Sequence, residues 1–192
     1  KLTDTIAEDI SDYPSTSNFG DLQKNYYKED IYVGYRYFET FAKDKVLYPF
    51  GYGLSYTSFK YSDLVISPSV ITPKQDVAVR LNVTNTGDRE GDEVVQMYIR
   101  DIIGSVTTYE KNLRGFERVN LQPGETKEVM FTITPEDLSL YNEEEKWVVE
   151  PGDFRIMIGS SSADIRLSDT LTVVSYQDSR VPDANKKNAT KW

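Results

Sequence analysis

The stretch Asp76-Val77-Ala78-Val79-Arg80-Leu81-Asn82-Val83 decides the fold, because branched apolar residues occupy every second position. Successive side chains of a β-strand point to opposite faces, so these four residues would share one face. A strand with one apolar face and one more polar face is typical of antiparallel sheets that pack face to face. The stretch therefore predicts a half-buried strand.

The same period of two recurs further along the chain, and turn signals separate the runs. Gln122–Glu125 and Glu150–Asp153 each place Pro before Gly, as a type II turn requires, and Asn85–Asp88 is a further turn signal. We therefore expect roughly seven short strands in an immunoglobulin-like or fibronectin type III-like β-sandwich over residues 58–174. The other alternating residues are Val95, Met97, Ile99, Val129, Phe131, Ile133, Phe154, Ile156, Ile158, Leu171 and Val173.

Residues 1–57 have a different character. Nine of the fourteen tyrosines lie between Tyr13 and Tyr56, with little of the Val/Ile alternation that marks strands. Apolar residues at helical spacing predict a helix over Glu29–Ala42, although Gly34 weakens it. So many aromatic side chains on a short segment cannot bury one another, so we expect the segment to pack against another domain. Residues 175–192 are polar and are interpreted as a tail or linker.

Composition excludes several classes of function. The chain has no Cys and no His, which removes thiol chemistry, sulfur-based zinc sites and a histidine general base. A net charge of −9 disfavours both nucleic acid and anionic membrane surfaces as partners. We expect no metal and no cofactor. No secretory signal opens the chain, and this leaves the localisation open between cytoplasmic and secreted or periplasmic.

Several motifs together resemble one family. Ile31–Phe38 and Val46–Thr57, which contains Tyr-Pro-Phe-Gly-Tyr-Gly-Leu-Ser-Tyr-Thr, closely resemble the end of the α/β sandwich domain of family 3 glycoside hydrolases. Five later motifs, in the same order as in that family, are similar to its fibronectin-like domain. They are Asn85-Thr86-Gly87, Gly91–Gln96, Leu113–Glu117, Leu121–Glu125 and Trp147–Gly152.

The resemblance implies a mainly β chain in three units: residues 1–57 as the terminal fragment of the α/β domain, 58–174 as the fibronectin type III-like domain, and the tail. It also implies a retaining β-glucosidase-type hydrolase of terminal β-linked sugars. In that family a barrel domain supplies an Asp nucleophile beside a Trp, and the α/β domain supplies a Glu acid/base upstream of the tyrosine-rich motif. Neither context occurs in this sequence, so no residue is assigned as catalytic.

The expected role is therefore structural, with the barrel and α/β domains of the same enzyme as partners and a β-glucoside or oligosaccharide bound through them. The alternative is a free-standing β-sandwich module that binds carbohydrate or protein. Exposed aromatic residues on the sandwich surface would favour the module. Aromatic residues confined to the amino-terminal segment would favour the structural role.

Five residues of the tyrosine-rich part, residues 1–57, are candidates for interdomain packing: Tyr32, Arg36, Tyr48, Phe50 and Tyr52. Aromatic rings and an arginine also suit a sugar. Packing is favoured because alternate aromatic residues from Tyr48 to Tyr52 would give an extended segment one aromatic face, and Arg36 among tyrosines suits an interface.

Two residues of the connection Ile102–Leu113, Tyr109 and Lys111, are weak candidates for substrate binding. A loop docked on the barrel domain is favoured over a substrate-facing one. The triplet Glu143-Glu144-Glu145 is expected to face solvent. Asp92 and Glu93 are expected on opposite faces of a strand, where they cannot share a substrate.

Overall fold

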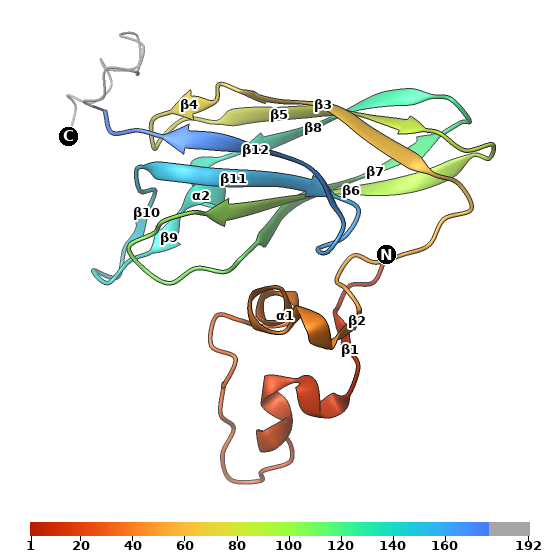
Figure 1. Ribbon diagram of the computed structural model, residues 1–192. Coiled ribbons are helices and arrows are strands. Elements are labelled where there is room, and N and C mark those ends of the chain that lie inside the picture. Colours follow the sequence, from red (N-terminus) through yellow and green to blue (C-terminus); the bar gives the residue numbers. More distant parts are fainter. Residues whose placement is uncertain (177–192) are drawn as a thin grey trace.

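The computed structural model describes residues 1–176, and these form a β-sandwich with a smaller amino-terminal part beneath it (Figure 1). The sandwich strands run between Phe59 and Val173. The chain is therefore mainly β, as the alternating residues predicted. Residues 177–192, which include most of the predicted tail at 175–192, lie outside the described residues.

Two sheets pack face to face in the sandwich. The larger has the strand order β4-β12-β11-β6-β7 and the smaller β3-β5-β8. Neighbouring strands are antiparallel except for the parallel pair β4 and β12. Their bounds are β3 (Phe59–Ser67), β4 (Val70–Ile71), β5 (Val77–Asn85), β6 (Gly91–Asp101), β7 (Asn112–Leu121), β8 (Thr126–Ile133), β11 (Gly152–Gly159) and β12 (Ile165–Val173).

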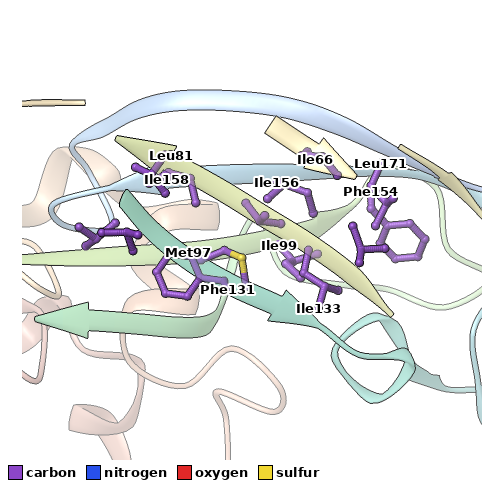
Figure 2. Close-up of a cluster of buried hydrophobic side chains, with 14 of the residues drawn as sticks. Ile66, Leu81, Met97, Ile99, Phe131, Ile133, Phe154, Ile156, Ile158 and Leu171 are labelled. Carbon is purple, nitrogen blue, oxygen red and sulfur yellow. The ribbon is translucent and has the colours of Figure 1, made fainter. Parts of the chain in front are cut away.

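The core lies between the two sheets, where the alternating residues meet. Val77, Val79, Leu81 and Val83 on β5 are all buried, as predicted. They belong to one cluster with side chains of the facing sheet, among them Ile156, and Figure 2 shows part of this cluster. Full burial of such a side chain contributes about 1.5–3 kcal/mol, so this core is the main source of the sandwich's stability.

One of the two predicted type II turns forms and the other does not. Gly124 has a φ of 74°, and the Glu125 N–H donates to the Gln122 carbonyl at 3.0 Å, as that turn requires. At Glu150–Asp153 the prediction is wrong. Gly152 is instead the first residue of β11 and pairs with Val173 of β12, and this pairing needs extended backbone rather than a positive φ.

A short helix and a hairpin fill the connection between β8 and β11. Helix α2 (Pro135–Leu138) begins after Thr134, whose N–H and hydroxyl both donate to the Asp137 carboxylate at 2.9 Å. The strands β9 (Leu140–Tyr141) and β10 (Trp147–Val148) then pair with each other and with no other described strand. This hairpin lies at one end of the sandwich (Figure 1).

The amino-terminal part consists of short elements around a small core of its own. Strand β1 (Ile6–Ala7) pairs with β2 (Val46–Tyr48), and Ala7 packs with Phe38 and Ala42. Between the strands lie helix α1 (Tyr35–Phe41) and the 3-10 helices η1 (Ile10–Asp12), η2 (Pro14–Asn18) and η3 (Lys43–Lys45).

The predicted helix over Glu29–Ala42 is wrong at its start, because α1 begins only at Tyr35. Gly34 takes a φ of 62° and a ψ of −131°, a conformation outside the helical region that glycine adopts easily. Asp30 also has a positive φ, of 51°. The residues before Gly34 therefore form turns rather than a first helical turn. Within residues 1–176, no helix is long and apolar enough to cross a membrane.

Candidate functional site

Helix α1 holds the amino-terminal part against the sandwich. Tyr35 and Glu39 are four residues apart and so lie on the same face of the helix. The Tyr35 hydroxyl accepts a hydrogen bond from the Leu113 N–H of β7 at 2.8 Å, and its ring stacks on Phe50 with 4.6 Å between centroids. The start of β7 and the tyrosine-rich motif thus meet at one helical residue.

A buried ion pair lies beside this contact. Lys111 Nζ is 2.9 Å from Glu39 Oε2 and also donates to the Ser162 carbonyl at 2.7 Å. Each of the two charged residues is only 7% exposed. The Lys111 ammonium is therefore bound inside the chain, between α1 and the loop after β11. Of the two candidates for substrate binding, Lys111 has the less accessible position.

The loop between β6 and β7 contacts the amino-terminal part through Tyr109. The Arg36 guanidinium lies 4.6 Å from the centre of the Tyr109 ring and donates to Asn112 Oδ1 at 3.0 Å. Tyr32 meets the edge of Tyr109 with 6.3 Å between ring centroids. Its hydroxyl donates to the Thr108 carbonyl at 3.4 Å. Two of the five packing candidates thus meet at this loop.

At Gly51 the backbone of the amino-terminal part lies very close to the side chain of Gln96. Gly51 has a φ of 79°, and a Cβ added to it would lie 2.3 Å from Gln96 Oε1. The buried Gln96 amide donates to the Ser160 carbonyl at 2.7 Å, and its oxygen accepts from the Tyr98 hydroxyl at 2.5 Å. Glycine is favoured here, because a side chain at this positive φ would be strained and would displace Gln96 from these bonds.

The remaining packing candidates differ in position. Phe50 stacks on Tyr35, and its carbonyl accepts from the Ser162 N–H at 2.9 Å, so it contacts the sandwich. Tyr48 and Tyr52 instead contact each other, with 5.3 Å between ring centroids, and Tyr48 is exposed. The structure thus places Tyr32, Arg36 and Phe50 against the sandwich, and leaves Tyr48 with a free face.

Three residues of this contact were not singled out in the sequence: Glu39, Gln96 and Asn112. Glu39 carried a usable signal, since it lies four residues after Tyr35 on the face that also holds apolar side chains. Gln96 lies in β6 between Val95 and Met97. Its position on the outer face of a strand gave no sign that this face is buried.

Exposed apolar side chains gather before residue 59. Within residues 1–176, thirteen of the twenty exposed large hydrophobic residues belong to this part. The most exposed are Phe19, Leu22, Tyr27, Leu54 and Tyr56. A concentration of exposed apolar side chains in one segment is typical of an interaction surface. We call residues 1–57 with these side chains the aromatic segment.

A groove of about 770 Å³ opens where the aromatic segment, the β6–β7 loop and the β9–β10 hairpin meet. We call it the hairpin groove. A recess of about 50 Å³ adjoins it and shares Tyr109 and Arg114 with it. Aromatic and charged side chains line the groove: Arg36, Tyr109, Arg114, Glu136, Tyr141 and Trp147.

The acidic residues near these surfaces differ in burial. Burial raises the pKa of the Asp101 carboxyl, which lines the recess. Glu143, Glu144 and Glu145 lie exposed at the hairpin turn, as expected. Asp92 is exposed and Glu93 is buried. Within residues 1–176, no cluster of carboxylates could hold a metal ion.

Comparison with known proteins finds a family model and relatives that are similar to this chain. A family model described as a fibronectin type III-like domain matches residues 93–162. Thermostable β-glucosidase B of Acetivibrio thermocellus is 43% identical over 177 residues, which cover 91% of this chain and 23% of that enzyme. A β-xylosidase of Formosa agariphila is 42% identical over 175 residues, with 90% and 23% covered.

A solved structure agrees with these relatives. β-Glucosidase 3B from Thermotoga neapolitana, in complex with α-D-glucose, superposes with a TM-score of 0.81 at 42% identity. The match covers 88% of this chain and 24% of that one. The chain therefore spans about a quarter of the length of the relatives it matches.

The sandwich is a fibronectin type III-like domain, and the solved structure on which the chain superposes is that of a β-glucosidase. The sequence motifs and the relatives narrow this class of domain to one family of enzymes. The chain belongs to glycoside hydrolase family 3 and corresponds to the carboxyl-side part of such an enzyme.

Proposed function

We propose that the chain is the non-catalytic structural portion of a retaining β-glucosidase-type hydrolase that acts on terminal β-linked sugars, and that it holds the domains of that enzyme together. The aromatic segment is the terminal fragment of the α/β domain, and the barrel and the rest of the α/β domain are its partners. The β-glucoside or oligosaccharide substrate binds through those domains.

One observation carries this proposal. The aromatic segment is fixed to the sandwich by buried polar contacts, such as that of Lys111 with Glu39, while many of its apolar residues are exposed. A segment that is anchored on one domain and also exposes many apolar residues suits a position between two domains. Interfaces inside one chain commonly bury such surfaces.

Activity measurements on the purified chain test this role. With an aryl β-glucoside as substrate we expect no hydrolysis above the uncatalysed rate, since the contexts of both catalytic carboxylates are absent from residues 1–192. Turnover that persists through repurification, and that falls on substitution of a carboxylate of this chain, would contradict a non-catalytic role.

The second candidate function, a binding module, has one observation in its favour. Within residues 1–176, three large aromatic side chains are exposed on the sandwich and its connections: Phe116, Tyr141 and Trp147. Phe116 lies on β7, whereas Tyr141 and Trp147 lie together on the hairpin. Most exposed aromatic residues belong to the aromatic segment, so the structural role is the primary proposal.

A further inference from the structure

The hairpin groove has the size and the boundaries of a small-molecule site. Its volume of about 770 Å³ lies within the range of roughly 300–1,000 Å³ that is usual for such sites. Its walls come from the β6–β7 loop, the β9–β10 hairpin, helix α2 and Arg36 of helix α1. Short strands, helices and a loop therefore contribute side chains that line a common space.

An aromatic platform forms one wall. Trp147 and Tyr141 are partners across the two hairpin strands, and their rings lie 5.4 Å apart at an angle of 55°. They are 71% and 50% exposed, although both line the groove. The ring of Tyr109 lies on another wall. Aromatic faces bind the apolar C–H faces of a sugar ring well, because those faces are flat and carry partial positive charge.

Two buried donors of the groove lack acceptors within the described part of the chain. Arg114 makes no hydrogen bond or ion pair there, and its Nε is buried without an acceptor. The Nε of Arg36 is also buried and unpaired. Asp101 lines the adjoining recess with Arg114, and within residues 1–176 its carboxylate accepts only the Ile103 N–H, at 3.2 Å. Unpaired buried donors are costly, which favours a ligand that supplies acceptors.

The charges of the groove select a neutral ligand. An anion would be attracted by Arg36 and Arg114 but repelled by Glu136 and Asp101. A cation would be attracted by the two carboxylates but repelled by the two arginines. A hydroxyl group both donates and accepts, so it can serve a guanidinium and a carboxylate at the same time. A polyhydroxylated ring therefore matches both the polar groups and the aromatic platform.

We propose that the hairpin groove is a binding site for a neutral pyranose, stacked on Trp147 and Tyr141 and hydrogen-bonded by Arg114. Tyr109, a substrate-binding candidate from the sequence, lines this site, whereas Lys111 does not. The proposal does not depend on the proposed structural role.

Titration of the 192-residue chain with cellobiose tests the site. Trp192→Phe leaves Trp147 as the only tryptophan, so that fluorescence reports on the platform. We expect a saturable change with a Kd of roughly 1–10 mM, a range typical of a few weak contacts. Amide shifts in NMR spectra should map to the groove residues. Absence of saturation at concentrations about tenfold above this range would overturn the proposal.

Substitutions locate the site. Trp147→Ala and Arg114→Ala should each weaken binding about tenfold or more when followed by NMR. Phe116→Ala is the matched control, because Phe116 is exposed on the sandwich but does not line the groove. Unchanged melting temperatures show that the variants are folded. Equal affinity in all three variants would overturn the proposal.

Two further ligands separate the alternatives. Glucuronate, an anionic pyranose, should bind more weakly than glucose, and equal binding would contradict the selection for a neutral ring. If the groove instead accommodates another domain of the enzyme and has no affinity for sugar, the chain will show no saturable sugar binding, and the proposal is overturned. Hydrolysis assays read out the structural role independently, so either proposal can fail while the other stands.

Discussion

Lys111 Nζ lies 2.9 Å from Glu39 Oε2, in an ion pair that joins the aromatic segment to the sandwich across 72 positions of sequence. Both side chains are nearly inaccessible to solvent. An intact buried ion pair adds little to the free energy of unfolding, because removing two charges from water is costly. Loss of one partner is far more damaging, since the other charge is then buried alone.

Lys111→Met should therefore destabilise the chain strongly. We expect the free energy of unfolding, measured by chemical denaturation, to fall by about 3–5 kcal/mol. The double variant Lys111→Met with Glu39→Met should recover much of this loss. Lys146→Ala is the control, because the Lys146–Glu144 pair is exposed, and such pairs are worth about 0–1 kcal/mol. Equal effects of Lys111→Met and Lys146→Ala would contradict a buried, coupled pair.

Gly51→Ala should loosen the aromatic segment from the sandwich. The added Cβ would overlap the Gln96 side chain, and the positive φ adds backbone strain. Gly20→Ala is a matched control, since Gly20 also has a positive φ, of 88°, but no heavy atom lies within 4 Å of an added Cβ. We expect a larger drop in melting temperature for Gly51→Ala. A drop no larger than that of Gly20→Ala would contradict the close contact with Gln96.

The local signals of the sequence predicted the sandwich well, because burial on one face of a strand leaves a period of two. The burial of four residues on β5 could be predicted without information from the rest of the chain: Val77, Val79, Leu81 and Val83. The contact between the aromatic segment and the sandwich could not be derived in this way. Lys111 and Glu39 are far apart in sequence, and neither residue type signals burial, since charged side chains are rarely buried.

Two errors of local prediction have a common cause, the context of a glycine. The spacing of apolar residues predicted a helix that begins before Gly34, whose positive φ lies outside the helical region, so α1 begins only at Tyr35. The Pro-Gly pair at Pro151 predicted a turn, but pairing of Gly152 with Val173 imposed a strand. Glycine permits several conformations, and the surrounding contacts decide among them. The hairpin groove likewise depends on segments that only the fold brings together.

The pH dependence of stability should report on Asp164. A hydrogen bond from Arg166 holds the pKa of the Asp164 carboxyl below its usual value of 3.8. A carboxyl group whose pKa is lower in the folded state than in the unfolded state stabilises the fold at pH values above its unfolded-state pKa. This contribution is lost as the pH falls through the folded-state pKa. We expect the melting temperature of the wild type to exceed that of Asp164→Asn at pH 6. The difference should shrink below about pH 4. A constant difference down to pH 2.5 would contradict the ionised pair.

Limited proteolysis should separate the aromatic segment from the sandwich. Residues 21–28 are exposed throughout, and Lys24 and Lys28 offer trypsin sites there. Within residues 1–176 we expect the first cuts at these lysines and a surviving fragment that contains residues 58–174, because exposed backbone with few contacts is cleaved first. Mass spectrometry identifies the fragments. Early cleavage between Asp76 and Ile158 would contradict the proposed boundary at residue 57.

The structural role is tested most directly in a relative that is a whole enzyme. In thermostable β-glucosidase B of Acetivibrio thermocellus, the 177 matching residues can be deleted or replaced by the corresponding residues of this chain. With an aryl β-glucoside, we expect the deletion to abolish turnover and the replacement to restore it. Full activity of the deletion variant, or a folded replacement that is as inactive as the deletion, would contradict the proposal that this chain holds the domains of such an enzyme together.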